Sequence, residues 1–121
     1  MKNGVTIVEN RIVIDYNGAH LVRFINHIRF CVSCSHCCEV YFDLIKPVVA
    51  PIAISKLELL LPKDSFCKIH RQSIIHRNIL QYAIIKDEKI YYFTHTLPVS
   101  HTKIDELLHI LVTFPFSEQT E

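Results

Sequence analysis

The sequence predicts a mainly β fold of short antiparallel strands, with one short internal helix and one C-terminal helix. Short runs rich in Val, Ile, Phe and Tyr alternate with turn residues, which is typical of strands. Helical spacing of apolar residues is clear at only two places. Half of the 121 residues are hydrophobic and only two are glycine, so we expect one packed domain over 1–121.

The first third of the chain holds short apolar runs with turn signals between them. The expected elements are strands at 6–8 and 11–15, a turn at 16–18, and a strand-rich segment at 21–34 that breaks at Asn26 and His27. Glu9 and Asn10 suit a tight turn between the first two strands, which are therefore expected to lie side by side.

The middle of the chain contains the internal helix and most of the remaining strands. The spacing of Ile54, Leu57 and Leu61 predicts a short helix that Pro62 ends. Val48 and Val49 lie between two prolines, so that segment is expected at a sheet edge or in a loop. The other expected strands are 39–45, 66–69 and 74–82, followed by a hairpin of 84–85 with 90–93.

The last element is an amphipathic helix. Ile104, Leu107, Leu108 and Leu111 repeat at i, i+3, i+4 and i+7, which predicts one apolar stripe. Ser100 or Thr102 could cap its N-terminus, and Thr102 with Asp105 forms a weak capping box.

Composition excludes several classes of protein. The formal net charge is +1, which by itself indicates neither a nucleic acid nor a membrane partner. The most apolar region, 44–61, is interrupted by charges and prolines, and the N-terminus lacks a signal-peptide core, so we expect no membrane span and a cytoplasmic location. No catalytic or phosphate-binding motif is present, and we expect no enzyme and no cofactor.

Four cysteines gather around His36: Cys31, Cys34, Cys37 and Cys38. Thiolates at such spacings can hold zinc or an iron–sulfur cluster, but the second pair of ligands that structural zinc sites use is missing. Because part of the cluster falls in a strand-like run, core or loop thiols are the favoured interpretation. A metal or redox sensor built on these four residues is the alternative.

The charge is unevenly distributed along the chain. From 66 to 103 there are six basic and two acidic residues, whereas the remainder has seven basic and ten acidic residues. A local positive surface could contact phosphates, although an ordinary solvated surface explains the same charges.

Two motifs together resemble the LytTR family of bacterial DNA-binding domains. One is Phe66-Cys67-Lys68-Ile69-His70-Arg71-Gln72-Ser73-Ile74-Ile75-His76, and the other is Leu97-Pro98-Val99-Ser100 before the last helix. Their order and separation match the family over about 4–111, which leaves 112–121 as a C-terminal tail. The resemblance implies about ten short strands in small antiparallel sheets, and loops that enter the major groove of double-stranded DNA.

The resemblance also implies the residues that contact DNA. They are His36 in the loop Cys34–Cys38, Lys68, Arg71, Gln72, and the segment Ser100, His101, Thr102 and Lys103. An arginine such as Arg71 can bond the O6 and N7 atoms of guanine together, and lysines suit phosphates. The sequence differs from the family where Gln72 replaces Ser, where His76 replaces Asn, and where His101 and Thr102 replace basic residues.

The expected function is that of a stand-alone bacterial transcription regulator that binds DNA sequence-specifically and has no receiver domain. A homodimer on repeated half-sites and control by an unidentified regulatory protein remain open. The weakened basic segment after Ser100 and a mean hydropathy of +0.22 favour one alternative, a protein-interaction module on the same fold.

Overall fold

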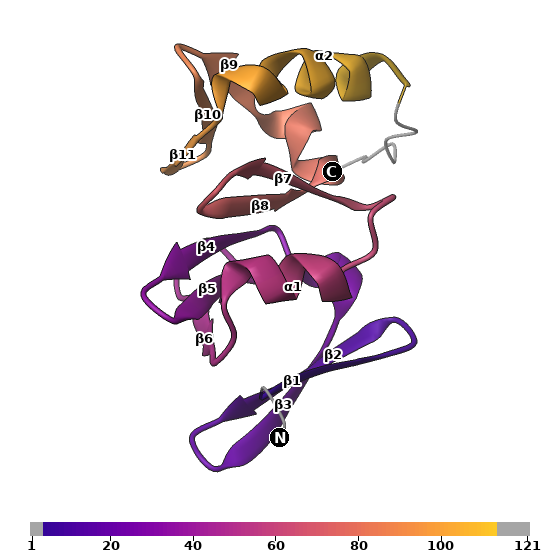
Figure 1. Ribbon diagram of the computed structural model, residues 1–121, viewed down its shortest axis with the longest axis vertical. Helices are drawn as coiled ribbons and strands as arrows, with labels where there is room; N and C mark the ends of the chain where they lie inside the picture. The colour runs from indigo at the N-terminus through magenta and orange to yellow at the C-terminus, as the bar shows by residue number, and fades with distance from the viewer. Residues whose placement is uncertain (1–3, 114–121) are drawn as a thin grey trace.

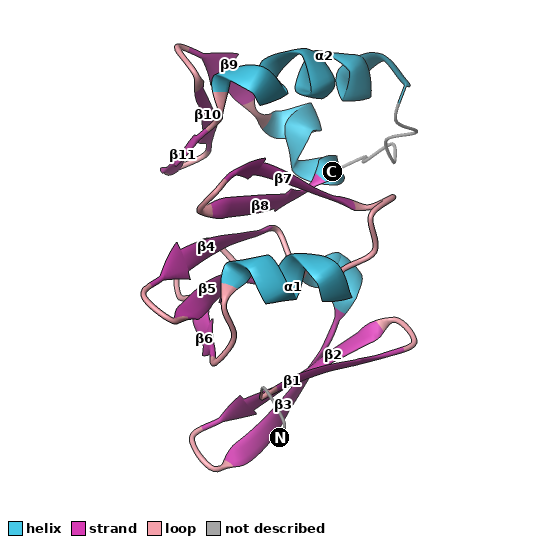
Figure 2. Cartoon of the chain, viewed as in Figure 1, coloured by secondary structure: helices cyan, strands magenta, loops and turns pink. Residues whose placement is uncertain are grey.

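The computed structural model describes residues 4–113, which form eleven short strands, two α-helices and three short 3₁₀ helices (Figures 1 and 2). The strands make three antiparallel sheets that follow one another along the long axis of the molecule (Figure 1). The mainly β fold with two helices is therefore confirmed.

The N-terminal sheet has the order β1-β2-β3. Its strands are β1 (Val5–Val8), β2 (Arg11–Tyr16) and β3 (Ala19–Phe24), and the 3₁₀ helix η1 (Ile25–His27) follows them. Glu9 adopts a left-handed φ of 56° in the two-residue turn between β1 and β2. The predicted hairpin is thus confirmed, and so is the predicted break at Asn26 and His27.

The central sheet has five strands in the order β6-β5-β4-β8-β7. They are β4 (Phe30–Cys34), β5 (Cys37–Tyr41), β6 (Val48–Ala50), β7 (Phe66–His70) and β8 (Ser73–His76), with α1 (Ile54–Leu60) before β7. Val48 and Val49 lie in the edge strand β6, as the flanking prolines predict.

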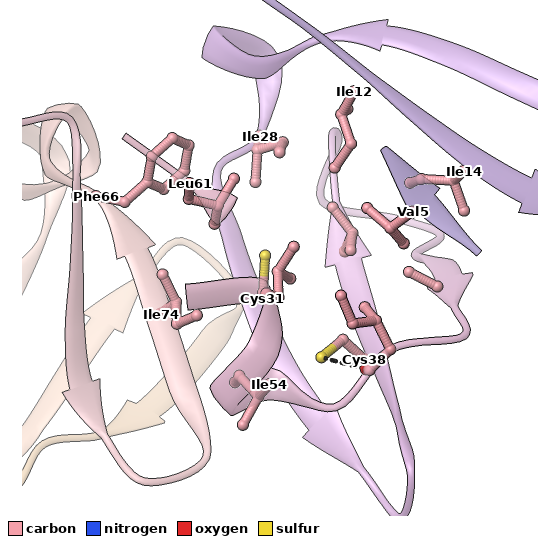
Figure 3. Close-up of a cluster of buried hydrophobic side chains, with 14 of the residues drawn as sticks. Val5, Ile12, Ile14, Ile28, Cys31, Cys38, Ile54, Leu61, Phe66 and Ile74 are labelled. Atoms are coloured by element: carbon pink, nitrogen blue, oxygen red, sulfur yellow. Dashed lines mark hydrogen bonds between the residues drawn. The ribbon is translucent and has the colours of Figure 1, made fainter. Parts of the chain in front are cut away.

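The two faces of the central sheet pack into two separate cores. On one face Cys31 and Cys38 pack with Ile54 of α1 and with side chains of the N-terminal sheet such as Ile12 (Figure 3). On the other face Phe30 and its neighbours meet the C-terminal half of the chain. Because side chains alternate along a strand, adjacent residues of β4 contribute to different cores.

The C-terminal half covers the second face of the central sheet. Its elements are η2 (Arg77–Tyr82), β9 (Ile84–Lys86), β10 (Lys89–Tyr92), β11 (His95–Pro98), η3 (His101–Lys103) and α2 (Ile104–Thr113). The three strands form a sheet in the order β11-β10-β9, and α2 contributes Leu107 and Ile110 to the core that this sheet shares with the central sheet. Leu108 and Leu111 of the predicted apolar stripe are instead 49% and 39% exposed.

Several sequence expectations are wrong in detail. The strand expected at 39–45 begins at Cys37 and ends at Tyr41, because the Asp43 carboxylate accepts hydrogen bonds from the amides of Ile45 and Lys46 and closes a turn. The strand expected at 74–82 ends at His76, where the 3₁₀ helix η2 begins. Strand β11 was not expected from the sequence.

The predicted cap of the last helix is also wrong. Ser100 precedes η3 without a side-chain capping bond, and Thr102 lies inside η3 rather than at a helix start. Val112 and Thr113, expected to begin the tail, form the end of α2, while 114–121 lie outside the described residues.

Candidate nucleic-acid interface

Backbone hydrogen bonds tie three surface loops of the central and C-terminal parts together. The loops are the turn Ser35–His36 between β4 and β5, the turn Arg71–Gln72 between β7 and β8, and the segment Ser100–Lys103 before α2. The amide of Ser33 donates to the carbonyl oxygen of Gln72 at 2.9 Å, and the amide of Ser100 donates to that of Ile69 at 2.8 Å. The structure thus connects all three predicted DNA-contacting loops.

The turn after β7 presents the arginine of the predicted site. Arg71 and Gln72 are exposed, and Arg71 makes no ion pair among residues 4–113. The amide of Gln72 donates to Nδ1 of His70 at 3.2 Å, which fixes the backbone of the turn. The Arg71 guanidinium therefore projects from a fixed turn with its donors unused by acidic groups of the described chain.

The hairpin tip between β4 and β5 carries His36. Cys34 and Cys37 are register partners at its base, and Ser35 adopts a left-handed φ of 56° to close the two-residue turn. Ser35 and His36 are both exposed. A tight hairpin tip of this kind is narrow enough to enter a major groove about 12 Å wide.

The segment before α2 is less cationic than the sequence suggests. Lys103 Nζ lies 3.3 Å from Glu106 Oε1, and His101 Nδ1 lies 3.2 Å from Glu88 Oε2. Asp105 and Glu106 occupy the first turn of α2, where they compete with phosphate for the positive end of the helix. The expected phosphate site at Ser100 is therefore weakened by acidic neighbours.

Lys68 is turned toward α1 and is only 25% exposed. Its Nζ lies 3.6 Å from Glu58 Oε1, and with Arg77 and Lys103 it lines a small cavity of about 160 Å³ between α1 and the start of α2. The structure thus places Lys68 beside Lys103 but does not place it on the turn that presents Arg71.

His76, where the resembled family has Asn, is buried and has a structural role. Its Nδ1 accepts a hydrogen bond from the amide of Asn78 at 3.1 Å and so caps η2. Its Nε2 lies 3.4 Å from Asn26 Oδ1. Burial lowers the pKa of His76, because the charged ring would lose its contact with water and the accepting Nδ1 would become a donor.

The four clustered cysteines do not form one site. Cys31 and Cys38 are fully buried on the face of the central sheet toward α1, whereas alternation places Cys34 and Cys37 on the opposite face. Within 4–113 no three His, Cys, Asp or Glu residues are grouped to hold a metal ion. The structure therefore does not bring these four thiols together into one site within the described chain.

Burial explains the chemical state of the core thiols. It is the main cause that raises the pKa of Cys31, and it raises the pKa of Cys38 and of Cys67 to about 11. These thiols stay protonated near neutral pH, and thiols are weak nucleophiles and weak metal ligands in that form.

The sequence did not reveal that the basic residues Lys68, His101 and Lys103 have acidic partners. Lys103 and Glu106 are three residues apart at the start of a helix, so their pairing could have been expected. The pairs of Lys68 with Glu58 and of His101 with Glu88 join distant parts of the chain, and only the fold reveals them.

The helices of the described chain are short. None among residues 4–113 is long and apolar enough to cross a membrane.

Comparison with known proteins identifies the fold. No protein-family model matches the sequence, and no curated protein sequence matches it. Among solved structures, the chain is similar to a LytTr DNA-binding domain from Bacillus cereus, with a TM-score of 0.67 and 16% sequence identity. The superposition covers 86% of this chain and 98% of that domain. The chain therefore has a LytTR-like fold, as its two motifs predict.

Proposed function

We propose that this chain binds double-stranded DNA sequence-specifically through its three connected loops and acts in transcription regulation. The observation that carries the proposal is the Arg71 guanidinium, which has no acidic partner among residues 4–113. It lies on a turn that is hydrogen-bonded to Ser33, in the strand that leads into the neighbouring hairpin tip, on a fold shared with a DNA-binding domain. The proposed DNA-binding region is 4–111, and no catalytic role is assigned to it.

Side-chain chemistry determines which of these residues contact bases and which contact phosphates in the proposed interface. Arg71 reads a base edge, because its planar fork can donate two parallel hydrogen bonds to guanine. His36 reads a second position from the hairpin tip. Ser100, His101, Thr102 and Lys103 hold the phosphate backbone beside these readers, and Gln72 is close enough to Arg71 in sequence to contact the same groove.

The intramolecular ion pairs set the expected strength of binding. Lys68, His101 and Lys103 each have a carboxylate partner that competes with phosphate. Counterion release drives phosphate binding, so fewer free cations give a weaker and less salt-dependent affinity. We therefore expect measurable DNA binding at low salt. The affinity should fall steeply with rising salt only if several phosphates are contacted.

Selection from a random double-stranded DNA pool, followed by sequencing, tests the proposal. The selection is done at low and at moderate salt with the full chain. Enrichment of a repeated motif is expected and would also give the spacing of half-sites for a homodimer. Salt-sensitive binding without enrichment would overturn sequence-specific recognition, and no binding at low salt would overturn DNA binding itself.

A second candidate function is that of a protein-interaction module. Leu108, Leu111 and Val112 are exposed on the outer side of α2, with Val112 84% exposed. Exposed apolar side chains on one helix are typical of contact surfaces. Self-association measured by sedimentation without DNA, and lost in Leu108→Glu, would support this candidate, whereas a monomer at high concentration would contradict it.

A further inference from the structure

Two cysteines face each other at the tip of the β4–β5 hairpin. Cys34 and Cys37 are register partners on either side of the turn Ser35–His36, and their Sγ atoms are 2.7 Å apart. The thiol of Cys37 also donates to the carbonyl oxygen of Cys34 at 2.8 Å. Both residues are partly exposed, so reagents in solution can reach them.

We propose that Cys34 and Cys37 form a reversible disulfide, and that this bond weakens DNA binding by changing the hairpin tip that carries His36. The second half of this proposal rests on the proposed function. Cross-strand partners have Cα atoms about 4.5–5.5 Å apart, within the range that disulfides span, so no strand needs to move. Forming the bond removes the thiol donor from the Cys34 carbonyl at the base of the turn that carries His36.

The other three cysteines cannot substitute for this pair. Cys31 and Cys38 are fully buried on the opposite sheet face, and Cys38 donates to the carbonyl oxygen of Ile52 at 3.1 Å. Cys67 is buried, and its thiol donates a hydrogen bond to Glu106 Oε2 at 3.4 Å. Of the five free thiols, only Cys34 and Cys37 are therefore both accessible and in contact.

The chemistry is thiol–disulfide exchange with a low-molecular-weight disulfide such as oxidised glutathione. Burial and the hydrogen bond to Cys37 raise the pKa of Cys34 to about 12, so Cys34 keeps its proton and Cys37 attacks first. The reagent S–S bond breaks, a mixed disulfide forms at Cys37, and one reagent thiol leaves with the Cys37 proton.

The second step closes the protein disulfide. Cys34 loses its proton and attacks the Cys37 sulfur of the mixed disulfide, and the second reagent thiol leaves with that proton. Two protein thiols are oxidised and one reagent disulfide is reduced to two thiols, so atoms and electrons balance.

Thiol counting by mass spectrometry tests the disulfide without using DNA. The reduced, folded chain is incubated with oxidised glutathione, quenched, denatured and alkylated. We expect three alkylated cysteines instead of five, with the missing pair mapping to one peptide over 34–37. Five alkylated cysteines, or a missing pair elsewhere, would overturn the proposal.

Matched variants identify the roles of the two thiols. Cys34→Ser should stop at a glutathione adduct on Cys37, because the resolving thiol is gone. Cys38→Ser keeps a donor for Ile52 and changes a neighbouring cysteine on the other face, so it should oxidise like the wild type. Loss of oxidation in Cys38→Ser would overturn the assignment.

DNA affinity of the two redox forms then tests the switch. On a selected site, we expect oxidation to weaken binding about fivefold or more, the size of one lost base contact, and the reductant dithiothreitol to restore it. Equal affinity of both forms would overturn the switch. If neither form binds any DNA, the proposed function and the switch both fail, while the disulfide site stands on the mass measurement.

Discussion

The amide of Ser33 donates a hydrogen bond to the carbonyl oxygen of Gln72, at a distance of 2.9 Å. This bond extends the pairing of β4 with β8 beyond their last register pair, Val32 with Ser73. The hairpin tip that carries His36 and the turn that carries Arg71 are thereby held at a fixed separation. Side chains on two loops can read neighbouring positions of one DNA site only if that separation is preserved.

Arg71→Ala should weaken binding to a selected DNA site by about 1–3 kcal/mol, because a bidentate contact to guanine is lost. Arg23→Ala is the matched control, since Arg23 is an exposed arginine of β3 in the N-terminal sheet and its removal changes the net charge equally. Fluorescence anisotropy at constant salt measures both. Equal effects of the two substitutions would show that Arg71 contributes only charge.

Leu107→Ala should lower the free energy of unfolding by about 2–5 kcal/mol, whereas Leu108→Ala should change it by less than about 0.5 kcal/mol. Leu107 is fully buried in the second core, and its neighbour Leu108 is half exposed. Urea unfolding followed by circular dichroism compares the two variants. A larger loss in Leu108→Ala would mean that the outer side of α2 is covered in solution.

His76→Asn should make stability less dependent on pH below neutrality. Burial lowers the pKa of His76 in the folded state, so the unfolded chain binds a proton first as the pH falls through about 6.5. Stability from neutral His76 is therefore present at higher pH and is lost on acidification. Asn can still accept from the Asn78 amide through its side-chain oxygen, which keeps the cap of η2.

The control for His76→Asn is His109→Asn, which replaces an exposed histidine of α2. Unfolding midpoints in urea between pH 5 and pH 7.5 are compared for the three proteins. The unfolding midpoint of His76→Asn should fall less on acidification than those of the wild type and of His109→Asn. An equal fall of the midpoint in all three proteins would contradict the role assigned to His76.

Local patterns predicted most of the fold because strands, turns and the internal helix have clear sequence signals. The incorrect predictions occur where a side-chain cap or a pairing strand decides the structure. The segment from Ile74 to Tyr82 was expected to be one strand because of its Ile, Leu and Tyr residues, but the His76 side chain caps a 3₁₀ helix after β8. Strand β11 contains Pro98 and has weak alternation, and it is stable only as an edge strand paired with β10.

The proximity of the candidate loops was predictable from the sequence, but their electrostatics were not. The two motifs assigned Arg71 and Ser100 to one site, and the fold brings the loops of these residues together. The carboxylates of Glu58 and Glu88 are far from Lys68 and His101 in sequence, so these contacts follow from the fold alone. The fold also separates the clustered cysteines, with Cys31 and Cys38 on one face of the central sheet and Cys34 with Cys37 on the other.

Glu106→Gln should strengthen DNA binding about two- to fivefold at low salt, because it releases Lys103 from a partly exposed ion pair of modest strength. The salt dependence should become steeper, since one more free cation can replace counterions on a phosphate. The amide oxygen of Gln can still accept from Cys67, so the packing of α2 is preserved. Anisotropy titrations over a series of salt concentrations measure the affinity and its slope.

Glu9→Gln is the control for this last prediction, because it removes the same charge from the exposed turn between β1 and β2. A general change in net charge would strengthen binding equally in both variants. A gain confined to Glu106→Gln would mean that Glu106 competes with phosphate for Lys103. If both variants bind with the wild-type affinity and slope, Lys103 does not contact the DNA backbone, and the role proposed for it is overturned.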